Sequence, residues 1–435
     1  GLGLLGRAVN DAKFLAAMGA ELIVTDLKDN EALRSSLEIL KPFPHVSYRL
    51  GGHDLKDFRG RDYVLKAAGI PLDSPHVAEA RKNGILIKMS ASWFAELSEI
   101  PIVGVTGTRG KSTTTYLLHD IMRAAGMQVL LGGNVRGVST LALLPTVGKD
   151  SIAVMELDSW QCRGFGDDSM SPTLSIFTTF YPDHLNYYKN SLDLYLADKA
   201  EIFLHQKPDD TLVVGSQAAL IIKEKYGSKI RSKVIVAEPS KFPKGWTLAI
   251  PGYHNFENAV CAIEAARALG IDDLVIKKTV AEFSGVPGRL EFLREARGVK
   301  IYNDNSSTTP EATIAALRAL GNKAERSVVL IMGGDEKNLD MNELIREIPK
   351  YCTAVILFKE RGTDRIRDKV FALEREGIKV YEEEGLEATV EKAFAVAEPG
   401  QTLLYSPAFS SFGKYFANEF ERGDQFIRLV EKIFA

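Results

Sequence analysis

The sequence has little cysteine, no long apolar run and little net charge, and each shortage narrows the range of functions. Its three cysteines are too few and too irregularly spaced for a disulfide framework or a metal site, which suits a reducing compartment. No uninterrupted apolar stretch could cross a bilayer and no signal peptide is recognisable, so we expect a cytoplasmic protein. The net charge of −3 provides no overall attraction to nucleic acid or to an anionic membrane.

The most informative stretch is a glycine-rich loop between an apolar run and an amphipathic segment. Residues 107–113 read Gly-Thr-Arg-Gly-Lys-Ser-Thr, and a helical stripe of leucine, isoleucine and methionine follows them. Two glycines let backbone N–H groups approach an anion, and the following helix adds the positive end of its dipole. Lys111 would then contact the β- and γ-phosphates of ATP, and Ser112 or Thr113 would bind its magnesium ion. The strict Walker pattern has glycine in place of Val105, so a plain turn before a helix is the alternative.

Two later apolar runs end in polar residues that belong at the same edge of a sheet. Residues 152–155 lead to Glu156, and residues 174–179 lead to Asp183 and His184. In a parallel α/β sheet, ligands bind beyond the carboxyl ends of the strands, so Glu156 and His184 are candidates for the magnesium and phosphate site. Taken alone, each could equally be a helix cap or an internally satisfied polar group.

Lys199 falls on the apolar face of the helix predicted at about residues 192–205. A lysine in this position must extend to solvent, pair with an acid such as Asp198 or Glu201, or be chemically modified. Periodicity alone favours the first two possibilities, so the modified lysine needs support from elsewhere in the sequence.

The two ends of the chain carry further α/β patterns. Glycines 1, 3 and 6, a helix to about residue 18 and a strand ending at Asp26 have Rossmann spacing, in which the acid binds a ribose or a base. The strand that usually precedes this motif is missing, so either the numbered chain starts after it or the motif is accidental. Near the other end, strands at 299–302, 328–332, 354–358 and 402–405 alternate with helices and predict a second doubly wound sheet.

These patterns predict an α/β protein of three domains. We expect a Rossmann-like domain at residues 1–97, a central P-loop ATPase-type parallel sheet at 98–285, and a Rossmann-like C-terminal domain at 286–435. At 435 residues the chain is long enough for each domain to form its own core.

The motifs, taken in order, resemble those of the Mur ligase family over essentially the whole chain. Besides the glycine loop, Glu156, His184 and Lys199, they are Gly133-Asn134, His254-Asn255-Phe256-Glu257-Asn258, Arg289-Leu290-Glu291, Asn303-Asp304, residues 333–337, Ser406-Pro407-Ala408 and Arg422-Gly423. The resemblance implies ATP-dependent amide-bond formation in bacterial cell wall synthesis by a monomeric enzyme. Within the family, the motifs are most similar to those of ligases that add D-glutamate to UDP-N-acetylmuramoyl-L-alanine through an acyl phosphate.

The resemblance also assigns the site residues. The catalytic residues would be Lys111, Glu156, His184 and Lys199. ATP would contact Gly107, Thr108, Arg109, Gly110, Lys111, Ser112, Thr113, Asn258, Arg289 and Asp304. One magnesium ion would bind Ser112 or Thr113 with Glu156, and a second would bind His184 and a carbamylated Lys199. The UDP-sugar substrate would contact Leu4, Asp26, Asn134, Ser159, Gln161 and His184, and D-glutamate would contact Thr308, Lys337 and Ser411.

The chain departs from the family pattern mainly outside the ATPase centre. Ser306 stands where a lysine is common, Leu5 and Ala67 replace frequent hydroxyl residues near the uracil, and residues 412–420 carry one extra residue. The motif that follows the magnesium glutamate reads Asp-Ser-Trp-Gln from Asp158, instead of Ser-Ser-Phe-Gln. These differences concern the amino-acid and uridine pockets.

Three alternatives compete with this hypothesis. A folylpolyglutamate synthase-like ligase would share the ATP chemistry, but such enzymes lack a Rossmann-like domain ahead of the ATP loop. A nicotinamide-dependent dehydrogenase would explain only the glycines at the start of the chain. A catalytically silent nucleotide-binding module would leave the reactive residues Lys111, Glu156, His184 and Lys199 without a role.

Overall fold

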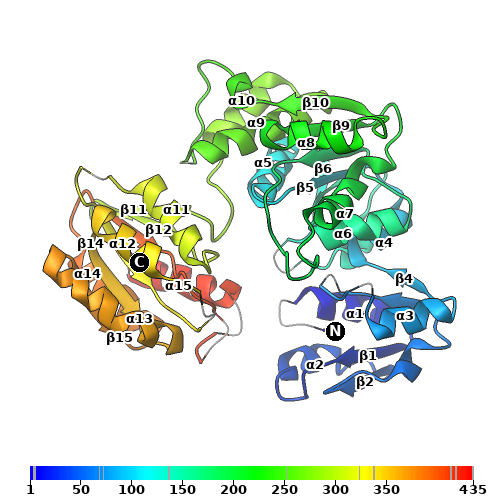
Figure 1. The fold of residues 1–435 in the computed structure, drawn as a ribbon, viewed down its shortest axis with the longest axis horizontal. Coiled ribbons are helices and arrows are strands. Elements are labelled where there is room, and N and C mark those ends of the chain that lie inside the picture. Colours follow the sequence, from blue (N-terminus) through cyan, green and yellow to red (C-terminus); the bar gives the residue numbers. More distant parts are fainter. Residues whose placement is uncertain are drawn as a thin grey trace. The chain divides into compact units, whose positions relative to one another are not determined.

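A computed structural model describes residues 1–2, 6–67, 69–71, 73–135, 138–250, 252–322, 324–336, 339–411, 414–416 and 419–433. The chain divides into two compact units, which are residues 1–249 with 253–283 and residues 250–252 with 284–435 (Figure 1). Each unit is described by itself. The domain boundaries expected after residues 97 and 285 stay a prediction.

The first unit begins with two small parallel sheets. In one, β1 (Leu22–Asp26) pairs with β2 (Val46–Leu50), and in the other, β3 (Tyr63–Leu65) pairs with β4 (Leu86–Lys88). The accompanying helices are α1 (Arg7–Ala17), α2 (Arg34–Leu40), α3 (Pro75–Lys82), α4 (Ser90–Ser98) and the short 3-10 helix η1 (Leu55–Phe58). The strand predicted to end at Asp26 is confirmed as β1, whereas β2 was not predicted.

Six parallel strands form the centre of the first unit, in the order β10-β9-β8-β5-β7-β6. Their bounds are β5 (Ile102–Thr106), β6 (Gln128–Gly133), β7 (Ser151–Glu156), β8 (Leu174–Phe177), β9 (Thr211–Gly215) and β10 (Lys233–Ala237). Every residue of β5, β7 and β8 is buried, as expected for parallel strands that are covered on both faces. The predicted central sheet is therefore present, and the sequence reasoning missed β9 and β10.

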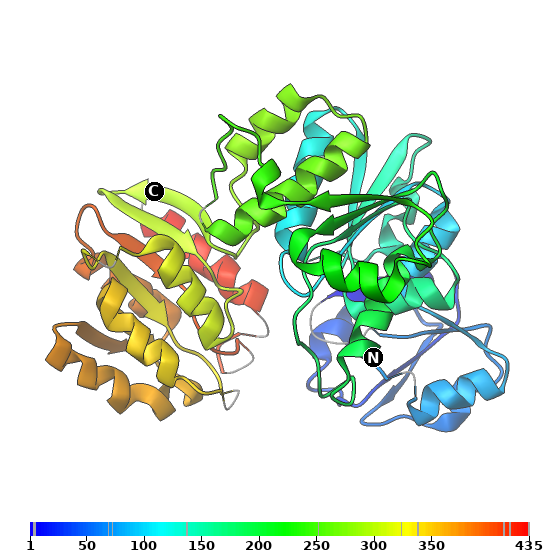
Figure 2. The same cartoon turned by 45° about the horizontal axis from the view of Figure 1, so that its top comes forward.

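Helices cover both faces of this central sheet (Figures 1 and 2). On one face α5 (Lys111–Ala124) packs against α9 (Tyr253–Ala268) and α10 (Asp273–Glu282). The other face carries α4, α6 (Ser159–Asp167), α7 (Leu192–Leu204) and α8 (Ser216–Tyr226), whose apolar side chains share one buried cluster. The short helices η2 (Leu141–Thr146) and η3 (Pro239–Lys241) complete this unit. In α5 the predicted apolar stripe is fully buried at Leu117, Leu118, Ile121 and Met122.

The second unit is a six-stranded sheet in the order β11-β12-β16-β13-β14-β15. Its strands are β11 (Glu291–Ala296), β12 (Val299–Asn303), β13 (Val328–Met332), β14 (Cys352–Phe358), β15 (Lys379–Glu383) and β16 (Thr402–Tyr405). The four predicted strands are confirmed. However, β11 runs antiparallel to β12, so the sheet is mixed rather than wholly parallel, and β15 was not predicted.

Two buried clusters flank the sheet of the second unit. One contains side chains of α11 (Pro310–Leu320), α12 (Asn342–Tyr351) and α13 (Arg361–Phe371), which is followed by η4 (Ala372–Glu376). The other contains side chains of α14 (Leu386–Val396) and α15 (Glu419–Ile433). Helices on both faces confirm the predicted doubly wound arrangement (Figure 1). None of the described helices combines the length and the apolar character that a membrane-crossing segment needs.

Candidate active site

The strand, glycine loop and helix predicted around Lys111 are present as β5, residues 107–110 and α5. Gly107 and Gly110 have φ angles of 141° and 87°, which side chains rarely adopt. A Cβ atom on Gly107 would lie 2.0 Å from Thr178 Oγ1, and one on Gly110 would lie 2.1 Å from Asn258 Oδ1. Both glycines are therefore required by conformation and by space. The first turn of α5 follows this loop directly, and its N–H groups can bind an anion.

The loop rests on the segment that follows β8. Thr108 N–H donates to Thr179 O at 2.7 Å, and Arg109 N–H donates to Thr179 Oγ1 at 2.9 Å. In return, Thr178 Oγ1 donates to Arg109 O at 2.6 Å. Because these two loop N–H groups are bonded within the protein, we expect the N–H groups of the first turn of α5, which lack intrahelical acceptors, to be among the donors to a phosphate.

Two lysines converge on one carbonyl of the loop. Lys111 Nζ donates to Gly107 O at 3.1 Å and to Thr108 O at 3.2 Å, and Lys199 Nζ donates to Gly107 O at 2.9 Å. The side chain of Lys199 is buried and its Nζ lies 4.9 Å from the centre of the Tyr195 ring. Burial, together with the nearby charge of Lys111, lowers the pKa of Lys199 to about 7. Lys199 therefore does not extend to solvent, which was one of the two alternatives that periodicity favoured.

Glu156 lies at the carboxyl end of β7, directly beside the end of β5. The carboxylate is buried, and Asn134 Nδ2 donates to its Oε1 at 3.4 Å. The Asn134 backbone N–H also donates to Glu156 O at 2.6 Å, and the Arg7 guanidinium donates to Asn134 Oδ1. Gly133 has no space for a side chain, because a Cβ atom would lie 2.1 Å from Glu156 O. The Gly-Asn motif thus positions the amide of Asn134 against the candidate metal carboxylate.

His184 follows β8 with a φ of 51°, and its side chain is exposed. Its ring packs on Trp160, with 4.8 Å between the ring centres, and lies 6.1 Å from the ring of Tyr195. The Tyr195 ring therefore contacts both Lys199 and His184. Tyr195 was not among the predicted site residues, although its position four residues before Lys199 places both on one helix face.

Other predicted substrate residues have defined local partners. At the start of α6, Gln161 Oε1 accepts from Asp158 N–H, and Asp158 Oδ1 accepts from Gln161 N–H. Asp158 and Gln161 thus form a capping box, and Ser159 is the first residue of the helix. Asp26 ends β1 and accepts from Lys28 N–H at 2.9 Å. On α9, Asn258 Nδ2 donates to Asn255 Oδ1 at 3.1 Å, as expected for residues on one helix face.

The remaining candidates belong to the second unit. Asp304 follows β12, is buried, and accepts hydrogen bonds from Ser307 Oγ, Ser406 Oγ and Leu290 N–H. Burial raises its pKa to about 6. Arg289 is exposed, Thr308 is half-buried and Ser411 is buried, whereas Leu4 and Lys337 lie outside the described residues.

The buried Arg422 is a residue that sequence reasoning noticed only as part of a motif. Its guanidinium donates to the carbonyl groups of Asn305, Phe409 and Ser410, which lie in the loops after β12 and β16. It thereby ties together two loops at the carboxyl ends of neighbouring strands.

Within the described ranges, no group of three or more His, Cys, Asp and Glu side chains is arranged to hold a metal ion. Magnesium commonly takes one or two protein ligands, with phosphate oxygens and waters in its other positions. Glu156 at a strand end and the hydroxyl groups in the first turn of α5 have the oxygen chemistry that magnesium requires.

A glycine loop that leads from a central parallel strand into a helix, with lysines at the loop and a carboxylate on the next strand, defines a P-loop type of nucleotide-binding α/β protein. Comparisons with known proteins narrow this class. The family model of the Mur ligase middle domain matches residues 105–238, and that of the Mur ligase, glutamate ligase domain matches residues 288–409.

Curated relatives match over almost the whole chain. The UDP-N-acetylmuramoylalanine--D-glutamate ligase of Roseiflexus sp. (strain RS-1) is 34% identical over 99% of this chain and 97% of its own. The protein of the same name from Caldanaerobacter subterraneus subsp. tengcongensis is 32% identical, with 99% and 96% of the two chains covered. The chain belongs to the Mur ligase family, whose members are ATP-dependent ligases.

Solved structures agree on the fold. The UDP-N-acetylmuramate-alanine ligase of Thermotoga maritima superposes with a TM-score of 0.62 at 19% identity, covering 100% of this chain and 98% of its own. The MurF ligase of Thermotoga maritima in complex with ADP superposes with a TM-score of 0.53 at 16% identity, covering 87% and 99%. The family assignment excludes the dehydrogenase that the glycines at the start of the chain left open.

Proposed function

We propose that this protein joins the amine of D-glutamate to the alanyl carboxylate of UDP-N-acetylmuramoyl-L-alanine, with conversion of ATP to ADP and phosphate. The observation that carries the proposal is the match, over 99% of the chain, to a relative with that name at 34% identity. The geometry supports the same chemistry, because Lys111 and Lys199 converge on the glycine loop while Glu156 ends the neighbouring strand.

The reaction is a phosphoryl transfer followed by an acyl transfer. The carboxylate oxygen attacks the γ-phosphorus of ATP and ADP leaves, which gives an acyl phosphate. The neutral amine of D-glutamate then attacks the carbonyl carbon, and the tetrahedral intermediate releases phosphate and a proton to form the amide. Negative charge develops on the phosphoryl oxygens in the first step, so the Lys111 ammonium and the N–H groups of the α5 first turn accelerate it by charge neutralisation.

Magnesium fits the oxygen donors beside the loop. Ser112 or Thr113 with Glu156 would hold one ion, and His184 with a carbamylated Lys199 would hold a second; when bound, these ions supply charge neutralisation for the phosphates. The burial of the Lys199 amine supports the carbamate, because burial and the charge of Lys111 favour the neutral amine, which is the form that reacts with carbon dioxide.

The two other substrates would contact different parts of the chain. The UDP sugar and its alanine would contact Asp26, Asn134, Ser159, Gln161 and His184, together with Leu4. D-Glutamate would contact Thr308 and Ser411, together with Lys337. The Ser411 hydroxyl supports this role, since it is buried and has no hydrogen-bond partner among the described residues.

An amino-acid panel tests the proposal. The protein is incubated with ATP, magnesium and UDP-N-acetylmuramoyl-L-alanine, and each candidate amino acid is added separately while ADP release and product mass are measured. We expect stoichiometric ADP and product with D-glutamate. Lys111→Ala should lower the rate on the order of a hundredfold, because it removes a charged contact to the transferred phosphoryl group. Product with another amino acid and none with D-glutamate would contradict the proposed substrate and indicate a ligase of this family with a different amino-acid specificity.

A further inference from the structure

Residues 178–181, here named the brace segment, support the glycine loop at several points. Besides the bonds from Thr178 and Thr179 described above, the Thr108 hydroxyl donates to Tyr181 O at 3.1 Å and accepts from Tyr181 N–H at 3.0 Å. The loop and the brace segment therefore form one hydrogen-bonded layer at the carboxyl ends of β5 and β8. Any displacement of the brace segment would be transmitted to the backbone of Thr108 and Arg109.

The brace segment is held from its other side by the turn between β9 and α8. Gln217 Oε1 accepts from Phe180 N–H at 2.7 Å, and Gln217 Nε2 donates to Phe180 O at 2.9 Å. One amide side chain thus pairs with both polar backbone groups of Phe180. The turn also approaches closely at Gly215, where a Cβ atom would lie 2.0 Å from Thr178 O.

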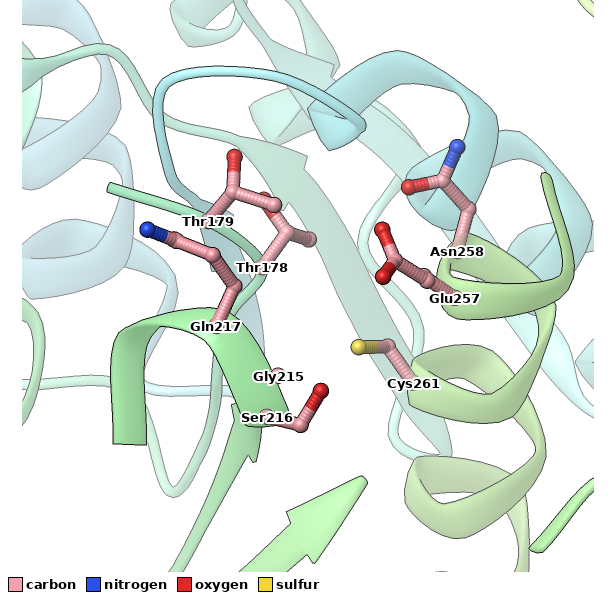
Figure 3. Close-up of a pocket in the computed structure, with 8 residues that line it drawn as sticks. All are labelled: Thr178, Thr179, Gly215, Ser216, Gln217, Glu257, Asn258 and Cys261. Atoms are coloured by element: carbon pink, nitrogen blue, oxygen red, sulfur yellow. The ribbon is translucent and has the colours of Figure 1, made fainter. Parts of the chain in front are cut away.

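Figure 3 shows the surroundings of this contact. Gln217 comes from α8 and extends along the side on which Thr178 and Thr179 lie, whereas Glu257, Asn258 and Cys261 come from α9 on the other side. A cavity of about 10 Å³ lies between them, enough for about one water molecule. Gln217 therefore restrains the brace segment at a point where packing leaves free space beside it.

We propose that Gln217 is a positioning residue for ATP. By pairing with Phe180 it fixes the brace segment, and through the brace segment it keeps the glycine loop in the conformation that receives the phosphates. Gln217 has no role in the chemistry, and it lies on the helix after a strand that sequence reasoning did not predict. The inference rests on the proposed function, because it assumes that ATP binds at the glycine loop.

The test compares Gln217→Met with a control variant at the amino ends of β5 and β8, away from the glycine loop. Gln217→Met keeps the length of the side chain and removes both hydrogen bonds to Phe180. The control is Thr173→Val, which removes the hydrogen bond from Thr173 Oγ1 to Ile102 O, at 3.1 Å, where β8 and β5 begin. Gln217→Glu is a second test variant, because it keeps the acceptor for Phe180 N–H and places a carboxylate oxygen against Phe180 O.

Calorimetric titration with ATP, thermal unfolding and steady-state kinetics are measured for all four proteins. We expect both Gln217 variants to bind ATP about tenfold more weakly and to raise KM for ATP more than they lower kcat. Thr173→Val should bind ATP as the wild type does, whatever its change in Tm. An ATP affinity within about twofold of wild type in Gln217→Met, or equal weakening in Thr173→Val, would overturn the proposal. Wild-type protein that fails to bind ATP would instead contradict the proposed function.

Discussion

At the scale of single residues, the buried Lys199 is the least expected feature of the site. A fully buried ammonium close to a second lysine is costly, and hydrogen bonds to Gly107 O and Thr106 Oγ1 compensate for only part of the lost hydration. No carboxylate of the described residues forms an ion pair with it, although Asp158 and Asp183 attract its charge. A stabilising modification or a nearby anion would remove this cost.

Replacing Lys199 tests whether it carries a carbamate. Lys199→Ala should be nearly inactive with ATP and magnesium, because an anionic oxygen ligand is lost, and a short added carboxylate should restore part of the rate. Native mass spectrometry provides a second readout, in which the wild type gains the mass of one carbon dioxide in bicarbonate and Lys199→Ala does not. Full activity of Lys199→Ala, or an unmodified mass in bicarbonate, would contradict the carbamate.

Asp304 gives a pH-dependent prediction. Its pKa is raised from the ordinary 3.8 to about 6 by burial, so its protonated form is favoured in the folded protein. The stability that this group contributes is therefore fully present below about pH 4 and is lost as the pH rises through about 6. Relative to Asp304→Asn, the wild type should lose roughly 2 to 3 kcal/mol of unfolding free energy over that range. Thermal unfolding of both proteins at several pH values measures this, and a difference that is independent of pH would contradict it.

At the scale of elements, α5 lies between two glycines that both have positive φ angles but have different surroundings. Gly110 precedes the helix with a φ of 87° and Gly126 follows it with a φ of 78°. A Cβ atom on Gly110 would collide with Asn258 Oδ1 at 2.1 Å, whereas one on Gly126 would have nothing within 4 Å.

This pair separates backbone strain from steric conflict. Gly126→Ala should cost only the strain of a left-handed alanine, about 1 kcal/mol, and leave ATP binding unchanged. Gly110→Ala must also displace Asn258 or the start of α5, so we expect a larger fall in Tm and ATP binding at least about tenfold weaker. Unfolding and ATP titration of both variants are the measurements. Equal effects of the two substitutions would show that the contact with Asn258 does not constrain the loop.

The strands β5, β7 and β8 could be predicted because their burial on both faces leaves a continuous apolar run. Glu156 lies at the end of β7, as that pattern predicted. The edge strand β10 begins with exposed Lys233 and Val234, so its pattern resembles a polar loop. β9 is buried and rich in valine, and its signal was present in the sequence but was not recognised.

The mixed sheet of the second unit could not be predicted from runs of apolar residues. β11 alternates half-buried and exposed positions, which is typical of an antiparallel strand with one face in water. Long-range contacts also escape sequence reasoning. The pairings of Gln217 with Phe180 and of Asn134 with Glu156 join residues 37 and 22 positions apart, and only the fold brings them together.

At the scale of the whole molecule, the order of the motifs carried more information than any single motif. A glycine loop alone indicates only phosphate binding, whereas the same loop followed by a strand-end glutamate, a buried lysine and the asparagines of α9 matches one family of ligases over the full chain. The near-zero net charge agrees with small substrates held by local groups.

The central claim is that the glycine-loop centre activates the alanyl carboxylate by phosphorylation. UDP-N-acetylmuramoyl-L-alanine labelled with ¹⁸O in both carboxylate oxygens tests it most directly, in a reaction with ATP and D-glutamate followed by mass analysis of the phosphate and the product. Because the acyl phosphate retains one carboxylate oxygen on phosphorus, we predict one ¹⁸O in each released phosphate and one in each new amide. Phosphate that contains no ¹⁸O, released together with product, would contradict the claim.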